Sequence, residues 1–217
     1  MHYREIIFCD FDGTVTEIET LEAFLQLFLS EDLRALGQEM MAKGYSVKQG
    51  IKETMARIPS DDYRRHTDFF RQLPIREGFE AFLDYAHTVG IPVVILSGGI
   101  REMVETSMAP YRDKILDIWS GEVDLSGEYV RFYSPYESDT EVVSKVGIMR
   151  CYDCDRTICV GDSYTDLEMA AAADVVFARD RLASAMEKAG KKHFTFETFY
   201  DMINVLKQQE EALHAGN

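Results

Sequence analysis

Short apolar runs alternate with longer stretches of helical periodicity along this chain. The apolar runs occupy residues 4–10, 91–97, 157–161 and 174–178, and polar residues follow each of them directly. Runs of this length are typical of strands that are buried on both faces of a parallel sheet. The helical patterns lie at residues 77–89, 100–109, 140–150, 165–172 and 182–189, and a closing helix is predicted at 196–213.

This alternation predicts an α/β fold, a Rossmann-like parallel sheet with helices on both faces. In such sheets ligands bind at the carboxyl ends of the strands. The polar residues that follow the apolar runs would all meet at that edge. A functional site is therefore expected there.

Residues 16–75 interrupt the alternation, because they show helical periodicity and no convincing strand. We interpret them as a small helical cap inserted after the first strand, and residues 1–15 and 76–217 as the catalytic core. Residues 119–133 alternate in the manner of strands around a Ser126-Gly127 turn, which predicts a hairpin-like excursion.

The charge balance narrows the choice of partners. The sequence has 217 residues, with 23 Lys and Arg against 38 Asp and Glu, and a formal net charge of -15. Such a charge repels nucleic acids and anionic lipids, so neither is expected as a partner. An anionic substrate would require a metal ion and local cations. The first residues do not resemble a signal peptide and no stretch approaches a membrane span, so we expect a cytoplasmic protein.

Two carboxylates stand two residues apart at the end of the first predicted strand, in Asp10-Phe-Asp12-Gly-Thr14. In an extended backbone both side chains lean the same way. One can attack phosphorus and bind a cation, while the other moves a proton to and from the departing oxygen. Mg²⁺, which prefers oxygen ligands, would offset the repulsion between the two acids.

Three later segments supply further candidates for binding a metal ion and a phosphate. Asp162, at a strand end, can join Asp10 and Asp12 as a metal ligand, and Asp166 follows one helical turn later and can orient it. Ser97 and Gly98 offer a hydroxyl and backbone amides to a phosphate. Lys145 supplies a point charge for the same phosphate.

These motifs, in this order, resemble those of the haloacid dehalogenase superfamily, and the resemblance covers essentially the whole chain. It implies that Asp10 forms an aspartyl-phosphate and that Asp12 is the general acid and base. It also implies that Ser97 and Lys145 hold the phosphate and that the late acids hold Mg²⁺. The implied activity is hydrolysis of a small phosphomonoester.

A helical insertion between the first two motifs is similar to that of the phosphoserine phosphatase branch. Within this branch several segments resemble the methionine-salvage phosphatases that act on 2-hydroxy-3-keto-5-methylthiopentenyl 1-phosphate. Those segments are Ser46–Ile51, Ile75–Phe79, Gly161–Asp166 and Phe177–Asp180. Phe24 and Met55 would then receive the apolar tail of the substrate. Glu19, followed by Thr20, instead resembles the serine-recognising pair of phosphoserine phosphatase.

Two functions other than hydrolysis remain open for this chain. It could be a signalling switch that is phosphorylated on Asp, or an inactive scaffold that binds a partner through the helical segment. The order of the motifs disfavours the switch, and the intact acids disfavour the scaffold. Lys48 and Lys52 are weaker candidates for contact with phosphate or substrate. Cys151 and Cys154 have the spacing of half a zinc site, but we interpret them as surface residues.

Overall fold

A seven-stranded sheet forms the centre of the computed structural model, which describes residues 1–29 and 33–215. The strand order is β4-β3-β2-β1-β5-β6-β7, and all neighbours are parallel except β3 and β4. The strands are β1 (His2–Asp10), β2 (Val93–Ile100), β3 (Asp117–Asp124), β4 (Arg131–Tyr133), β5 (Asp153–Gly161), β6 (Val175–Ala178) and β7 (Phe194–Thr195). The predicted fold class is confirmed.

Strand β1 lies in the middle of the sheet, between β2 and β5. Its second half, Ile6 to Asp10, is buried, which explains the unbroken apolar run that ends in an acid. Asp10 pairs with Leu96 of β2, and Cys9 pairs with Val160 of β5. The register therefore brings the carboxyl ends of these three strands to one edge.

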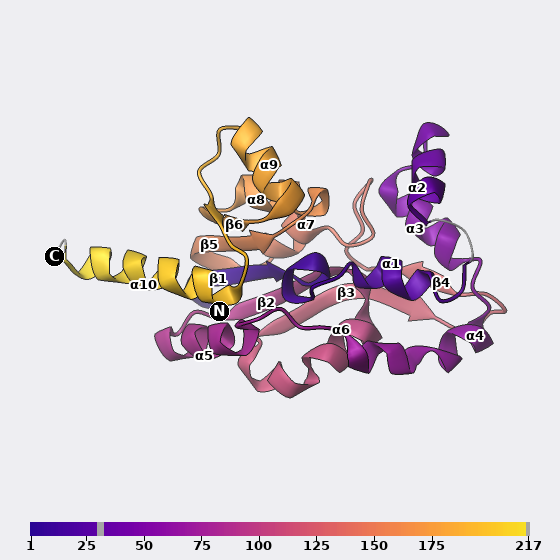
Figure 1. The fold of residues 1–217 in the computed structure, drawn as a ribbon, viewed down its shortest axis with the longest axis horizontal. Coiled ribbons are helices and arrows are strands. Elements are labelled where there is room, and N and C mark those ends of the chain that lie inside the picture. Colours follow the sequence, from indigo (N-terminus) through magenta and orange to yellow (C-terminus); the bar gives the residue numbers. More distant parts are fainter. Residues whose placement is uncertain (30–32, 216–217) are drawn as a thin grey trace.

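Helices cover both faces of the sheet (Figure 1). In that view α5 and α6 lie below the sheet, and α7, α8 and α9 lie above it, while α10 packs against α5. The bounds are α5 (Phe79–Val89), α6 (Arg101–Met108), α7 (Lys145–Met149), α8 (Leu167–Ala172), α9 (Asp180–Lys188) and α10 (Phe199–Ala215). No helix among the described residues is long and apolar enough to cross a membrane.

The segment 16–75, called the cap segment below, contains helices and no strand among its described residues. Its helices are α1 (Thr20–Leu25), α2 (Leu33–Ala42), α3 (Val47–Met55) and α4 (Ser60–Arg65), followed by a 3₁₀ turn at Thr67–Gln72. Figure 1 shows α1 to α4 together at one end of the sheet. An antiparallel bridge between Thr16 and Ile75 brings the two ends of the segment together.

The hairpin predicted at 119–133 is present, and it also holds the cap segment. Pro59 forms an antiparallel bridge with Tyr129. The backbone amide of Ser60 donates to the carbonyl of Glu128, and that of Val130 donates to the carbonyl of Ile58. Three neighbouring residues of the cap segment are thus fixed to the tip of the hairpin.

Three elements differ from the sequence-based prediction. Strand β3 also pairs with β2 in parallel, so it belongs to the central sheet and not only to an excursion. The helix expected at 140–150 begins only at Lys145, because the Ser144 side chain caps it by accepting from the amide of Gly147. Strand β7 has two residues, too few to leave a periodic pattern.

Candidate active site

The loop after β1 turns sharply at Gly13, where φ is 75°. A Cβ atom at Gly13 would lie 2.6 Å from Oδ2 of Asp162, so only glycine fits. The Arg76 guanidinium holds the loop from behind, since Nε donates to the Thr14 carbonyl and Nη2 to the Gly13 carbonyl, each at 2.7 Å. The sequence analysis did not single out Arg76, which follows the bridge residue Ile75.

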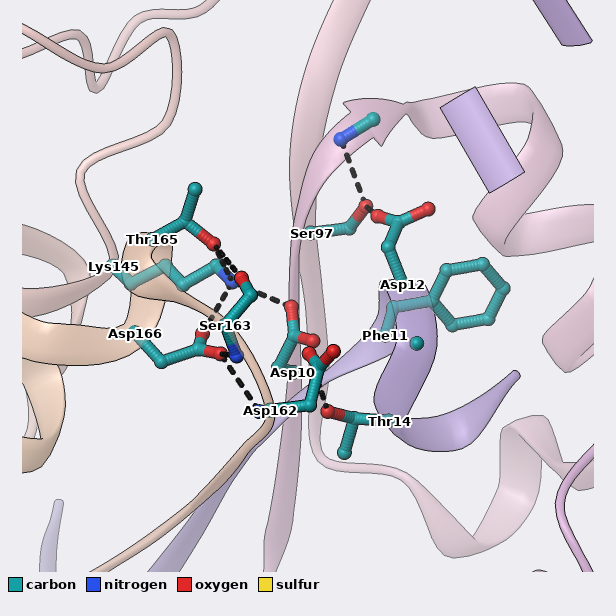
Figure 2. A network of polar contacts seen from close by, with 12 residues as sticks. Asp10, Phe11, Asp12, Thr14, Ser97, Lys145, Asp162, Ser163, Thr165 and Asp166 are labelled. Carbon is teal, nitrogen blue, oxygen red and sulfur yellow. Dashed lines mark hydrogen bonds and ion pairs between the residues drawn. The ribbon is translucent and has the colours of Figure 1, made fainter. Parts of the chain in front are cut away.

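Three buried acids meet at the carboxyl ends of β1 and β5 (Figure 2). Carboxylate oxygens of Asp10, Asp162 and Asp166 lie within 4.8 Å of one another, and this is the cluster with metal-ligating spacing among the described residues. Nζ of Lys145 lies 2.5 Å from Oδ1 of Asp10 and 2.6 Å from Oδ1 of Asp166. The site therefore holds three carboxylates against one buried ammonium.

The loop after β5 is organised by Asp166. Its Oδ2 accepts from the amides of Asp162 and Ser163, each at 3.0 Å. The Thr14 hydroxyl donates to Oδ1 of Asp162 at 3.2 Å, which connects this loop to the one after β1. Asp166 thus fixes the backbone of the segment that carries Asp162.

The crowding of negative charge changes the acidity of these groups. Burial raises the pKa of Asp10 well above its usual range, and the negative charge of Asp166 adds to this while Lys145 opposes it. Burial and Asp166 raise the pKa of Asp162 to about 6. Burial lowers the pKa of Lys145, but the charges of Asp10 and Asp166 outweigh it and hold that pKa well above its usual range. Additional positive charge would stabilise the ionised acids.

The Asp12 side chain points away from the acid cluster and towards β2, as Figure 2 shows. Its Oδ2 accepts from the Ser97 hydroxyl at 2.6 Å, and its Oδ1 accepts from the Thr20 hydroxyl. Ser97 Oγ also accepts from the amide of Gly99 at 2.9 Å. Gly98 adjoins open space, because a Cβ added there would meet no heavy atom within 4 Å. The structure therefore brings Ser97 and Gly98 beside the first loop.

Glu19 stands at the entrance to α1, facing the same site. It lines a hollow that also includes Gly13, Asp162 and Arg179. Glu19 is exposed at this hollow, although neighbouring protein atoms partly desolvate its carboxylate. This desolvation, with the charges of Asp162 and Asp12, raises the pKa of Glu19 to about 7.

Several weaker candidates lie elsewhere. Phe24 and Met55 have no exposed surface, so the prediction that they receive a substrate tail is wrong. Their apolar pattern reflects packing, as in the edge contact of Phe24 with Tyr63. Lys52 pairs with Glu137 at 2.5 Å, and Lys48 Nζ donates to the Ser138 carbonyl at 2.5 Å. These lysines join the cap segment to the core in this structure.

Sequence reasoning did not single out Arg76 and Thr14 for the contacts that they make, and it did not identify Thr20 as a partner of Asp12. Each acts through a contact with a residue distant in the chain or across a turn. Thr14 and Thr20 are buried in the structure, where a hydroxyl needs a hydrogen-bond partner, but their burial could not be inferred from the sequence. The identity of that partner requires the fold.

Comparison with known proteins gives consistent results. The model of the haloacid dehalogenase-like hydrolase family matches residues 7–171. A 2-hydroxy-3-keto-5-methylthiopentenyl-1-phosphate phosphatase of Microcystis aeruginosa is 36% identical over 204 residues, covering 93% of this chain and 97% of the relative. The protein of the same name from Brevibacillus brevis is 34% identical over 219 residues, covering 97% and 99%.

Solved structures show the same fold at lower sequence identity. A phosphoserine phosphatase structure with an analogue of the phospho-aspartyl intermediate matches with a TM-score of 0.66 and 15% identity, covering 95% of this chain and 99% of that one. A phosphoserine phosphohydrolase-like protein from Francisella tularensis matches with a TM-score of 0.70 and 17% identity, covering 93% and 99%.

Proposed function

This chain belongs to the haloacid dehalogenase-like hydrolase family, and from that premise we propose that it is a magnesium-dependent phosphatase in which Asp10 attacks a small phosphomonoester. The observation that carries the proposal is the state of the Asp10 carboxylate. Lys145 holds Oδ1, whereas Oδ2 is buried and has no hydrogen-bond partner among the described residues. A buried, unpartnered oxygen is costly unless a ligand or ion engages it.

The residues present suit a divalent cation. Asp10 and Asp162 supply oxygen ligands of the type that Mg²⁺ prefers, their carboxylates lie in one cluster, and Oδ2 of Asp10 has no hydrogen-bond partner among the described residues. We assign Asp10 and Asp162 as side-chain ligands and Asp12 as a ligand through its backbone carbonyl, with Asp166 in support. When bound, the ion would neutralise charge on the acids and the phosphate.

The other side chains of the site would bind the phosphate and transfer protons. Lys145 and the Ser97 hydroxyl, with the backbone at Gly98, would bind the phosphate oxygens. The position of Asp12, turned away from the acid cluster, supports its assignment as the general acid and base. Ser97 would exchange its bond to Asp12 for one to the phosphate when the substrate binds.

The chemistry follows in two steps. An oxygen of Asp10 forms a bond to phosphorus, the bond from phosphorus to the leaving oxygen breaks, and Asp12 gives its proton to that oxygen. Asp12 then takes a proton from a water molecule that attacks the phosphorus. The bond between phosphorus and Asp10 breaks, which releases phosphate and restores both acids.

For the substrate we propose 2-hydroxy-3-keto-5-methylthiopentenyl 1-phosphate, the compound in the names of the relatives at 36% and 34% identity. This would place the chain in methionine salvage. Phosphoserine is the second candidate, supported by the Glu19-Thr20 pair. An ionised Glu19 would bind the ammonium group of phosphoserine, whereas the proposed enol phosphate has no such group.

Phosphate release from three substrates tests the proposal. We expect the enol phosphate to be hydrolysed with a higher kcat/KM than phosphoserine or p-nitrophenyl phosphate. Asp10→Asn should lose activity on all three by about 10⁴-fold or more, the size of effect seen for a lost nucleophile. A preference for phosphoserine would overturn the substrate assignment only. Failure of the folded wild type to hydrolyse any of the three with Mg²⁺ would overturn the phosphatase assignment.

A further inference from the structure

A pocket of about 300 Å³ lies between the first three helices of the cap segment. Leu21 and Leu25 of α1, Met40 of α2 and Ile51 of α3 are among the residues that form its walls. Its volume is at the small end of the range for ligand sites, and apolar walls are typical of such sites. We call it the cap pocket.

The cap pocket adjoins the catalytic edge of the core. Glu19 lines both this pocket and the hollow that contains Gly13 and Asp162. The same side chain therefore borders the space above the catalytic acids and the apolar space inside the cap segment. A molecule whose phosphate lies at Asp10 would direct its other end towards Glu19 and the pocket beyond.

The lining is mostly apolar, and its charged residues are the acids Glu19 and Glu22, so it disfavours an anionic group. No Lys, Arg or His is among the described residues that line the cap pocket. The hydroxyls of Ser46 and Thr54 are already bonded within α3, since Ser46 Oγ accepts from the Gln49 amide and Thr54 Oγ1 donates to the Gly50 carbonyl. The pocket thus lacks a cation for a carboxylate, and burial of an apolar group there would remove apolar surface from water.

Gly37 gives the pocket a place where its size can be changed. It lies on α2 and lines the pocket, and a Cβ added there would meet no heavy atom within 4 Å. A larger side chain at this position would occupy space now open to a ligand. The Cβ atom of that side chain would not collide with any described residue.

We propose that the cap pocket binds the apolar, uncharged tail of the phosphomonoester substrate and thereby selects substrates that carry such a tail. The inference rests on the proposed function, because it places the phosphate at Asp10. It assigns recognition of the tail to Leu21, Met40 and Ile51 in place of the buried Phe24 and Met55. Glu19 then borders the polar middle of the molecule.

Gly37→Leu tests this proposal, with Gln38→Leu as the matched control, since Gln38 is exposed on the same helix and does not line the pocket. We expect Gly37→Leu to lower kcat/KM for the methylthio substrate roughly 30-fold, mainly through KM, as for the loss of a few buried methylene-sized groups. Activity on ethyl phosphate, which has no tail, should stay within about twofold. Gln38→Leu should change neither.

Gly37→Ala guards against misfolding, because alanine favours the helix and adds one methyl group. Its loss should be smaller than that of Gly37→Leu and confined to the tailed substrate. Equal losses on both substrates, or no loss on the tailed one, would overturn the proposal.

Calorimetric binding of pentylphosphonate, which carries the apolar tail but has no bond from phosphorus to a leaving oxygen and so cannot be hydrolysed, separates this inference from the proposed function. We expect the wild type and Gln38→Leu to bind it at least tenfold more tightly than Gly37→Leu does. That result in a protein without phosphatase activity would support the cap pocket and contradict only the proposed function. Equal affinity in all three proteins would overturn the cap-pocket inference even in an active enzyme.

Discussion

Lys145 and Asp166 form an ion pair closed off from solvent, with 2.6 Å between Nζ and Oδ1 and exposed fractions of 3% and 0%. The second oxygen of Asp166 accepts from two backbone amides of the loop that carries Asp162. Asp166 therefore fixes the positions of the buried ammonium and of a proposed metal ligand together. The motif spacing pointed to both residues separately, but their pairing is a property of the fold.

Asp166→Asn should destabilise the protein by about 1 to 3 kcal/mol, because it weakens one of the two buried contacts of Lys145, which keeps Asp10 as its charged partner. The amide group also cannot serve both Lys145 and the two backbone donors as acceptor. Urea unfolding monitored by circular dichroism measures the change. Asp155→Asn is the control, since Asp155 is exposed, and it should stay within about 0.5 kcal/mol of the wild type. A loss below about 1 kcal/mol for Asp166→Asn would argue against the supporting role.

Asp12→Asn should slow hydrolysis of alkyl phosphates by roughly a hundredfold or more, the usual size of a lost general acid. The asparagine oxygen can still accept from Ser97, so the local structure should persist. p-Nitrophenyl phosphate, whose leaving oxygen needs little protonation, should lose less. Rates of phosphate release from both kinds of substrate test this, and equal losses would contradict the assignment.

Removal of divalent cations with EDTA should stop turnover, and added Mg²⁺ should restore it. Binding can also be measured without activity: Mg²⁺ at about 100 times its Kd should stabilise the wild type by roughly 2.7 kcal/mol. Asp162→Asn should lose most of that stabilisation, whereas Asp155→Asn should keep it. Turnover that survives exhaustive chelation would refute the metal-dependent mechanism.

The shifted pKa of Glu141 predicts how the stability of the protein depends on pH. Burial, with the charges of Glu168 and Asp166, outweighs the opposing charge of Lys145 and raises the pKa of Glu141 to about 7. The folded state therefore favours the protonated acid. The contribution of protonated Glu141 to the free energy of unfolding is fully present below the ordinary pKa of a Glu side chain. It is lost as the pH rises through the pKa of Glu141 in the folded state.

Glu141→Gln, which stays neutral, should therefore stabilise the protein more at pH 8 than at pH 5. We expect a difference of at most about 1 kcal/mol, because Glu141 is partly exposed and solvent screens its charge. Thermal unfolding at both pH values provides the measurement. Glu53→Gln, on the exposed surface of α3, is the control and should show no comparable pH dependence. The same shift in both variants would contradict this reading of Glu141.

The parts predicted best from the sequence have strong local patterns. The buried run that ends at Asp10 identified β1, and the similar run that ends at Gly161 identified β5. Because parallel strands end at a common edge, the polar residues after them could be assigned to one site before the fold was known. The acid cluster of Asp10, Asp162 and Asp166 is consistent with that reasoning.

The parts predicted less well depend on long-range contacts. β3 alternates like a hairpin strand, and its parallel pairing with β2 leaves no separate local signal. The direction of the Asp12 side chain depends on hydroxyls from Thr20 and Ser97, which are distant from each other in the chain. Phe24 has the same periodicity whether it lines a pocket or fills a core, and only its burial distinguishes these cases.

The hydrogen bonds of Ile58 and Ser60 to the hairpin limit the route by which a substrate can enter. A cap segment that is held there, and bridged at Thr16 and Ile75, is poorly arranged for swinging open as one rigid body. We therefore expect entry to require movement of α2 and α3, which would break the contacts of Lys48 and Lys52 with residues 137–140. Since salt screens contacts between charges, the rate of this opening should rise with ionic strength.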